Sequence, residues 1–448
     1  MSMRVRWRIC TAIGFLAGLM LLTPLRAEEG VSLNKPERLE EFRDLGVGMF
    51  IHWSFDSQLG MVISHSMVGA SEDYVSRLVT ELPRTFDPKR YDPEEWARLA
   101  RVCGIKYAVF TTKHHSGFCM FHTQTTDFGI AHTPYAEDIT RQYVDAFRNQ
   151  GVHVGFYFSP DDFHFLWKQG TLISRRRPEA LPSHNPDLMQ HNLAQIRELL
   201  TNYGPIEYLF IDGEPGGIKE LAWQLQPDLV VTRGAMQTPE QKIPDQGLPG
   251  PWESNFTMGT QWQFKPTNED YKSGGELIRM LIETRAKGGN LLINVGPQPD
   301  GEIPFEQSRR LRELGLWLFI NGESIYGVRP WHVTHEDNIW FTKAKNADTL
   351  YAIVTGDPDW ERGTRKQFII RSARATGRSE ISVLGQNSKV LEYRPDVNPE
   401  CRWSQEADGL HVDVMRTQRI YNMGDWPNPV VLKITHVTQG SSPGVEAP

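Results

Sequence analysis

Cysteine is scarce in this chain, with four residues among 448. Cys10 lies in the N-terminal apolar stretch, which leaves Cys103, Cys119 and Cys401, an odd and widely spaced set. Such a set excludes a disulfide scaffold and favours buried free thiols. Basic residues are not in excess either: 48 Lys and Arg stand against 55 Asp and Glu. A nucleic-acid-binding protein, which needs a basic face, is therefore not indicated.

Two cofactor motifs are also missing. No GxGxxG follows any expected strand, so a dinucleotide-binding fold is disfavoured. No HxH or HExxH accompanies the histidine pair His114-His115, and a metal site would need a third ligand. A metal site at the histidine pair is therefore not favoured.

Long hydrophobic runs are confined to the N-terminus. Arg4, Arg6 and Arg8 precede an apolar stretch from Thr11 to Leu22, and Ala27 stands before two acidic residues. This pattern predicts a secretory signal peptide over residues 1–27. A membrane anchor is the alternative, but the stretch is shorter than the roughly 20 residues that a span needs. We expect export to the periplasm or the extracellular space and no membrane span in the mature chain.

Short β-rich runs alternate with amphipathic helical stretches over most of the remaining chain, which is typical of a parallel sheet covered by helices. The spacing favours a (β/α)8-like barrel catalytic domain over residues 34–330. Short strands separated by polar turns then predict an antiparallel β-sandwich over 331–438, and residues 439–448 are expected to be a disordered tail. The expected barrel strands are 48–53, 107–111, 153–158, 208–211, 229–232 and 290–295, and the expected helices are 92–103, 140–150, 186–203 and 273–287.

Two carboxylates carry the chemical interpretation. Asp212 directly follows the apolar run Tyr208–Ile211, which reads as a buried parallel strand, and barrel enzymes keep their chemistry at such strand ends. Glu253 follows Pro251 and Trp252, an apolar setting that would raise its pKa. Paired carboxylates predict a glycosidase, with Asp212 as nucleophile and Glu253 as acid/base.

Each of these assignments has an alternative. Asp212 could be a turn or helix-capping acid, and Glu214 is a rival to Glu253 as the acid. Arg233, at the next strand end, could keep the nucleophile ionised or form an ordinary ion pair. The basic run Arg175–Arg177 lies in a long insertion, where it could be a solvated loop or meet an anionic glycan.

His114 and His115 follow the second expected strand, where both could reach a pocket. They could be metal ligands, structural residues, or donors to a polyhydroxylated ligand. The last interpretation is favoured because His52 and Tyr157 occupy strand ends of the same kind.

The chain resembles the α-L-fucosidases of glycoside hydrolase family 29 over roughly residues 36–331. Several motifs occur in the order of that family, which is more specific than any one motif alone. They are GMFIHW (48–53), Ser71-Glu72, DPEEW (92–96), TKHHSGF (112–118), Asp212-Gly213, Pro251-Trp252-Glu253 and GNLLINVGP (289–297).

The resemblance implies a barrel with a C-terminal β-sandwich and retaining exo-cleavage of terminal α-L-fucose from a fucosylated oligosaccharide or glycoconjugate, with no cofactor. Asp212 matches the nucleophile and Glu253 the acid/base. The positions that hold the sugar or orient the nucleophile are matched by His52, Glu72, His114, His115, Tyr157 and Arg233.

The sequence departs from the family at Asp73, Phe210, Ser116 and the stretch that follows Glu253. These changes touch the expected pocket wall and the region beside the acid, so they bear on which sugar is bound rather than on the reaction. An α-L-galactosidase or modified-fucose glycosidase is therefore an alternative, because an apolar pocket rejects an added hydroxyl only weakly. A catalytically silent carbohydrate-binding protein on the same scaffold is a further alternative. The sequence does not indicate an oligomeric state.

Overall fold

The structure is a computed structural model that describes residues 32–357, 359–391, 393–417 and 428–440. The expected signal peptide, 1–27, lies outside the described residues. Residues 441–448 of the expected tail lie outside them as well, whereas Gln439 belongs to a strand. Among the described helices none is both long and apolar enough to cross a membrane.

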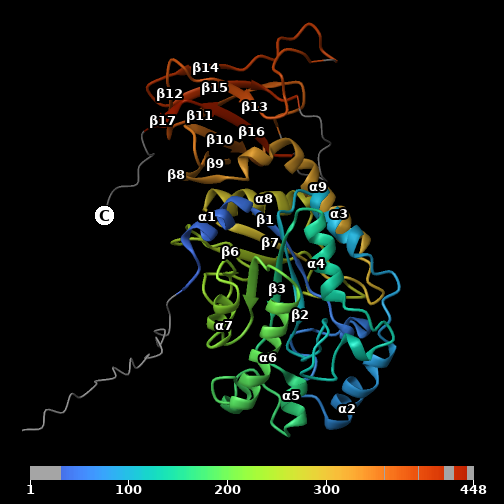
Figure 1. The fold of residues 1–448 in the computed structure, drawn as a ribbon. Helices are drawn as coiled ribbons and strands as arrows, with labels where there is room; N and C mark the ends of the chain where they lie inside the picture. The colour runs from blue at the N-terminus through green and yellow to red at the C-terminus, as the bar shows by residue number, and fades with distance from the viewer. Residues whose placement is uncertain (1–31, 358, 392, 418–427, 441–448) are drawn as a thin grey trace, which may run out of the picture. The chain divides into compact units, whose positions relative to one another are not determined.

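A parallel sheet of seven strands forms the first part of the fold (Figure 1). Its spatial order is β5-β4-β3-β2-β1-β7-β6. Strands that are neighbours in this sheet belong to different βα units, as in a (β/α) barrel. The strands are β1 (Val47–Ile51), β2 (Tyr107–Lys113), β3 (His153–Phe158), β4 (Tyr208–Ile211), β5 (Val230–Val231), β6 (Glu253–Thr257) and β7 (Asn290–Val295).

The two edge strands, β5 and β6, are not paired with each other. The segment after β5 instead runs parallel to β6 through isolated bridges between Gln237 and Trp252 and between Glu240 and Asn255. An irregular segment thus takes the place of an eighth strand. This arrangement brings residues 237–240 to the same edge of the sheet as the ends of β4 and β5.

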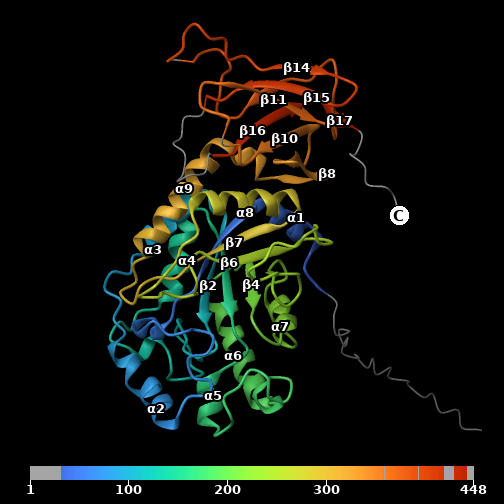
Figure 2. The same ribbon diagram turned by 180° about the vertical axis from the view of Figure 1, so that it is seen from behind.

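Helices cover the outside of the strands (Figures 1 and 2). Several begin with a side-chain cap, as where the Asp92 carboxylate accepts from the Glu95 amide and where Ser273 and Glu276 form a capping box. The helices are α1 (Pro36–Leu45), α2 (Glu72–Thr80), α3 (Pro93–Val102), α4 (Ile139–Asn149), α5 (Phe163–Lys168), α6 (Pro186–Asn202), α7 (Ile218–Leu225), α8 (Gly274–Ala286) and α9 (Phe305–Asn321).

Large side chains fill the interior of the barrel below the carboxyl ends of the strands. The rings of Phe42, Tyr107 and Tyr208 pack against one another in edge-to-face and tilted pairs, with centroids 5.3–5.5 Å apart. Above them Phe50 and Phe210 pack against Tyr157. The interior of the barrel is therefore filled by side chains and is not a pore. A pocket at the carboxyl ends of the strands can lie only above this aromatic layer.

Antiparallel sheets make up the C-terminal part. Sheets of five and three strands, ordered β13-β16-β10-β9-β8 and β11-β15-β14, enclose a core that includes Phe341, Ala352, Ile370 and Val412. The strands are β8 (Val328–Glu336), β9 (Ile339–Ala344), β10 (Thr349–Val354), β11 (Arg365–Ile370), β12 (Ala373–Ala375), β13 (Ile381–Val383), β14 (Arg402–Gln405), β15 (Leu410–Met415), β16 (Val430–Thr435) and β17 (Val437–Gln439).

The barrel with antiparallel C-terminal sheets confirms the fold class predicted from the sequence. The six expected barrel strands and four expected helices are present, and Gly104, Gly151, Gly204 and Gly288 follow the helices with positive φ. The sequence analysis missed β6, because Glu253–Thr257 (ESNFT) has too few apolar residues to read as a buried strand. Because β6 begins at Glu253, the position of this acid could not be predicted correctly without the strand.

The first prediction concerns the tight packing at Gly48. A Cβ at this position in β1 would lie 2.4 Å from the Tyr107 ring, which is itself fixed inside the barrel. Gly48→Ala should therefore lower the free energy of unfolding by about 1–3 kcal/mol, as overpacked cores do. Urea unfolding measures this change. Gly377→Ala is the matched control, because a Cβ at Gly377 meets nothing within 4 Å; equal effects of the two substitutions would contradict the prediction.

Candidate active site

A small pocket of about 160 Å³ opens at the carboxyl ends of the parallel strands. Such a volume suits one monosaccharide rather than a longer chain. Its walls come from strands, strand ends and the loops between elements, with aromatic, histidine and charged side chains together. The lining residues are Phe50, His52, Ser64, His114, Tyr157, Arg175, Phe210, Asp212, Arg233, Glu240, Asn255 and Trp262.

Asp212 is the centre of the contacts in this pocket. Its Oδ2 accepts a hydrogen bond from the Tyr157 hydroxyl at 2.8 Å and lies 3.4 Å from His115 Nε2. Its Oδ1 accepts from Arg233 Nη1 at 3.0 Å. Both carboxylate oxygens are thus held, which fixes the orientation of the side chain.

The backbone around Asp212 explains why the side chain lies here. The Asp212 amide donates to the Phe158 carbonyl of β3, and the Ile211 amide donates to the Arg233 carbonyl, so the ends of three strands are joined. Gly213 follows with φ of 152°, a conformation that a side chain rarely adopts. The chain can therefore turn away immediately after the acid.

The electrostatic environment favours a charged Asp212. Burial alone would raise the pKa of its carboxyl, but the contact with His115 and the positive charge of Arg233 outweigh burial and hold that pKa well below its usual value. The carboxylate is therefore ionised at neutral pH, as a nucleophile must be.

The other rings of the pocket are neutral donors and acceptors. Burial lowers the pKa of His52 to about 3 and holds that of His114 well below its ordinary value. His52 Nδ1 lies 2.7 Å from Asn294 Oδ1, and the His114 ring stacks on Tyr157 with centroids 5.0 Å apart. Trp262 packs against His52, 4.9 Å between centroids. Aromatic faces beside fixed polar atoms are typical of a site for a small polar ligand.

A buried ion pair holds the turn that carries the two histidines. Lys113, the last residue of β2, has its Nζ 3.2 Å from Asp162 Oδ2 and 2.9 Å from Asn192 Oδ1. The Phe163 amide also donates to the His115 carbonyl at 2.8 Å. His114 and His115 are thus tied to α5 and α6 from beneath.

Glu240 reaches the pocket from the irregular segment that bridges to β6. Its Oε2 accepts from Arg233 Nη2 at 3.0 Å, so one guanidinium contacts both Asp212 and Glu240. Its side chain is 43% exposed and lines the pocket. The sequence analysis did not single out Glu240. Its nearness to Arg233 in TRGAMQTPE (232–240) is a sequence clue, but the pairing of this segment with β6 was needed to interpret it.

Glu253, the acid/base expected from the sequence, does not line this pocket. It is the first residue of β6 and pairs with Asn290, the first residue of β7, so it lies toward the amino end of the sheet. Its fully buried carboxyl accepts a hydrogen bond from the Tyr107 hydroxyl within the aromatic interior. Asn255, two residues later on the same face of β6, is the residue of this strand that lines the pocket.

Burial raises the pKa of Glu253 to about 7, although the hydrogen bond from Tyr107 opposes this shift. The apolar environment expected around Glu253 is therefore confirmed, but it belongs to the barrel core. A pKa suited to an acid does not by itself identify the acid, because a general acid must also reach the leaving group.

Two further acids lie outside the pocket formed by the described residues. Glu72 begins α2, and its carboxylate accepts from the Trp167 indole at 2.8 Å. Glu214 accepts from the Ser183 amide at 3.0 Å. The predicted residues that do line the pocket are His52, His114, Tyr157, Asp212 and Arg233, while His115 lies behind Asp212.

His114, His115 and Asp212 have atoms within 4.8 Å of one another, a group that could hold a metal ion. Asp212, which is distant from the histidine pair in the sequence, therefore lies where a third metal ligand would be needed. However, Arg233 lies 3.0 Å and Arg175 3.9 Å from Asp212 Oδ1, and two guanidinium groups would repel a cation there. This charge arrangement favours a carboxylate that acts without a metal.

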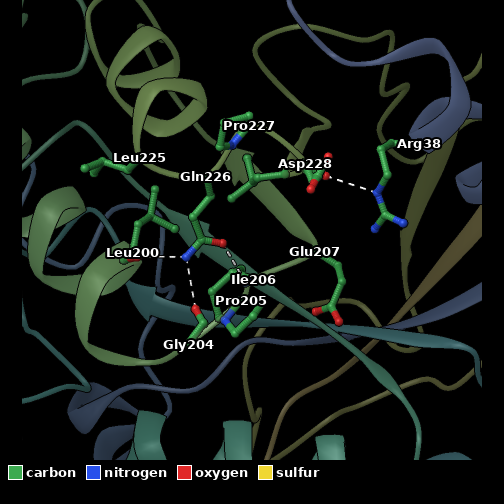
Figure 3. Close-up of a pocket in the computed structure, with 11 residues that line it drawn as sticks. Arg38, Leu200, Gly204, Pro205, Ile206, Glu207, Leu225, Gln226, Pro227 and Asp228 are labelled. Atoms are coloured by element: carbon green, nitrogen blue, oxygen red, sulfur yellow. Dashed lines mark hydrogen bonds between the residues drawn. The ribbon is translucent and has the colours of Figure 1, made fainter.

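A second, more open pocket of about 640 Å³ lies at the opposite ends of β4 and β5 (Figure 3). Its polar groups are already paired with each other. Gln226 donates to the carbonyls of Leu200 and Gly204 and accepts from the Ile206 amide, while Arg38 donates to the Asp228 carbonyl. These bonds join the loops at this end of the sheet. The two carboxylates of the lining also have partners, Asp228 with Lys35 and Glu207 with the Val154 amide.

Comparison with known proteins places the chain in a family. The family model described as α-L-fucosidase matches residues 27–323. Plasma α-L-fucosidase of Rattus norvegicus is 30% identical over 335 residues, which cover 67% of this chain and 70% of that protein. The α-L-fucosidase of Dictyostelium discoideum is 29% identical over 315 residues, which cover 64% and 66%.

Solved structures of α-L-fucosidases are also similar to this chain. The α-L-fucosidase isoenzyme 1 of Paenibacillus thiaminolyticus is 28% identical and superposes with a TM-score of 0.68, covering 89% of this chain and 98% of that one. A covalent intermediate of an α-L-fucosidase from Bacteroides thetaiotaomicron gives a TM-score of 0.71 with coverage of 92% and 98%. That protein is 20% identical, so the likeness is one of fold.

The second prediction concerns Glu253 and pH. Because the pKa of its carboxyl is about 7 in the folded chain and 4.5 as the ordinary value, the folded state binds the proton more tightly. The resulting stability is fully present below pH 4.5 and is lost as pH rises toward 7. Glu253→Gln cannot ionise and still accepts from Tyr107. Its stability relative to the wild type should therefore improve between pH 5 and 8, by on the order of 2–3 kcal/mol.

Urea unfolding of both proteins at pH 5 and pH 8 measures this difference. Because the buried Asp56, whose pKa burial also raises to about 7, is present in both proteins, its contribution cancels. A stability difference that does not change with pH would contradict the prediction.

Proposed function

Because the chain belongs to the α-L-fucosidase family and is thus a retaining glycoside hydrolase, we propose that this pocket hydrolyses terminal α-L-fucose from fucosylated oligosaccharides or glycoconjugates, with Asp212 as its nucleophile. The observation that carries the assignment is the contact set of Asp212, an ionised carboxylate at a strand end on the floor of a monosaccharide-sized pocket. Asp212 attacks C1 of the sugar, and the glycosidic bond breaks as an ester forms.

We propose Glu240 as the acid/base in place of Glu253. A general acid must approach the glycosidic oxygen from the side away from the nucleophile, and Glu240 comes from a different segment than Asp212. Its partial exposure allows exchange of protons with solvent. Glu240 then donates a proton to the departing oxygen, and its carboxylate later takes a proton from the water that cleaves the ester.

The neutral rings around Asp212 support a sugar site. His52 and His114 offer ring nitrogens without a charge, and Trp262 and Phe210 offer apolar faces. Arg233 contacts both carboxylates and so links nucleophile and acid/base. We assign His52, His114, Tyr157 and Arg233 to sugar binding and nucleophile orientation, with His115 acting through Asp212.

The remaining proposals concern the organisation of the chain. We propose a catalytic barrel over residues 34–330 and a β-sandwich over 331–438, in keeping with the change from parallel to antiparallel sheets near β8. We also propose that residues 1–27 direct export to the periplasm or the extracellular space, on the basis of their sequence pattern.

The third prediction tests the reaction. The protein should release the phenol from an aryl α-L-fucoside, and Asp212→Asn should lower kcat by at least 10³-fold because the amide cannot form the ester. Phenol release is followed by absorbance. Chelator treatment should leave the wild-type rate unchanged, since no step requires a metal. Full activity of Asp212→Asn would overturn the mechanism, and loss of activity on chelation would favour the metal site of His114, His115 and Asp212.

The fourth prediction separates three glutamates. Glu240→Ala should be slow, by about 10²–10⁴-fold, on fucosides with poor leaving groups and much less impaired on activated aryl fucosides. Azide should restore its turnover, because azide attacks the ester without needing a base. Glu214→Ala is the matched control and should show neither behaviour, and the same is expected of Glu253→Ala. Azide rescue of either of these two variants, with none for Glu240→Ala, would refute the assignment.

A further inference from the structure

One of the three arginines in the basic run Arg175–Arg177 lies inside the pocket, unlike the other two. Arg175 lines the pocket, and its side chain is 30% exposed, whereas Arg176 and Arg177 are exposed. The Ser174 hydroxyl accepts from the amides of Arg176 and Arg177, which fixes the turn that separates them from Arg175. The solvated-loop interpretation therefore holds for two of the three residues only.

The loop that carries Arg175 is anchored at both sides. Ala180 is fully buried between Leu166 of α5 and Leu188 of α6. The Arg175 Nε donates to Asp161 Oδ2 at 2.7 Å, and Asp161 is itself buried, 3.5 Å from His115 Nδ1. The guanidinium is thus held in place, and its terminal nitrogens are free to face the pocket.

The position of the guanidinium relative to Asp212 limits what it can contact. Arg175 Nη2 lies 3.9 Å from Asp212 Oδ1, too far for a hydrogen bond. C1 of the sugar must lie about 3–3.5 Å from an Asp212 oxygen before attack. Arg175 therefore faces the atoms attached to C1 or next to it, which are the glycosidic oxygen, the ring oxygen and the 2-hydroxyl.

Two of these three atoms can be excluded. The leaving group departs on the side of the ring opposite the nucleophile, whereas Arg175 lies beside the nucleophile, 3.9 Å from Asp212 and connected to it through Asp161 and His115. The ring oxygen shares the positive charge of the oxocarbenium-like transition state, so a guanidinium against it would slow the reaction. The 2-hydroxyl remains, and hydrogen bonds to it strengthen in this transition state.

We propose that Arg175 is a catalytic and specificity-determining residue whose guanidinium donates to the 2-hydroxyl of the sugar, so that the site takes sugars with a free 2-hydroxyl. The proposal rests on the proposed function, because it requires a sugar whose C1 faces Asp212. Asp161 is a positioning residue that acts through Arg175.

The experiment compares an aryl α-L-fucoside with its 2-deoxy analogue, after subtraction of spontaneous hydrolysis. The ratio of kcat/KM for the two substrates is taken on the same enzyme preparation, so it does not depend on the folded fraction. Arg175→Ala should lose about 10- to 100-fold on the fucoside, the usual effect of a charged hydrogen bond, and less than about threefold on the 2-deoxy analogue. Its substrate ratio therefore falls toward one.

The neighbouring residues supply the matched controls. Arg176→Ala and Arg177→Ala remove the same charge from the same loop and should keep the wild-type ratio. Asp161→Asn should lower the ratio, and the double variant with Arg175→Ala should lower it no further, since Asp161 acts through Arg175.

Two outcomes would overturn the inference. In the first, Arg175→Ala loses equally on both substrates, which would mean that the guanidinium does not act through the 2-hydroxyl. In the second, Arg175→Ala keeps the wild-type kcat/KM on both substrates, as the two controls do. A wild-type protein that cleaves neither substrate would instead refute the proposed function, so the two failures are distinguishable.

Discussion

The ionised state of Asp212 is the constraint on which the rest of the site depends. A carboxylate buried at the end of β4 is costly unless positive charge and hydrogen bonds compensate it. Arg233, Tyr157 and His115 supply this compensation, and each comes from a different strand end. The barrel must therefore hold these ends in one register, which the packed aromatic layer beneath them provides.

The two glutamates at β6 show why charge state and position must be considered together. Glu253 has the raised pKa that a general acid needs, but it lies in the core against Tyr107. Glu240 is bridged to the same strand at its pocket end, where it meets Arg233. Burial in apolar surroundings produces a neutral carboxyl anywhere in a protein, so only access to the substrate separates an acid catalyst from a structural acid.

The buried ion pair between Lys113 and Asp162 connects the site to the surrounding helices. It joins the end of β2 to the start of α5, and Asn192 extends it to α6. Asp161, next in sequence, holds Arg175 at the pocket. The inserted loop is thus connected to the residues that support the two histidines.

Much of this molecule could be predicted from the sequence. Alternating apolar runs and capped helices predict a barrel. Each strand and helix can be recognised locally, from its own periodicity and from the cap or turn that ends it. Asp212 could be identified in the same way, since a buried strand followed by an acid and a glycine is also local. The family motifs around His52 and His114 lie on such strands too.

The proposed roles of Glu240 as acid/base and of Arg175 at the pocket rest on the tertiary structure alone. Both depend on irregular segments whose position no periodic pattern encodes: residues 237–240 pair with β6, a polar strand that the sequence did not reveal, and Arg175 is fixed by Asp161. Trp252, next to Glu253 in the sequence, correctly indicated an apolar environment for the Glu253 carboxyl. It did not indicate at which end of the barrel this carboxyl lies. Which end of a strand a residue occupies, and which residues a loop brings to it, are set by contacts between segments distant in the chain.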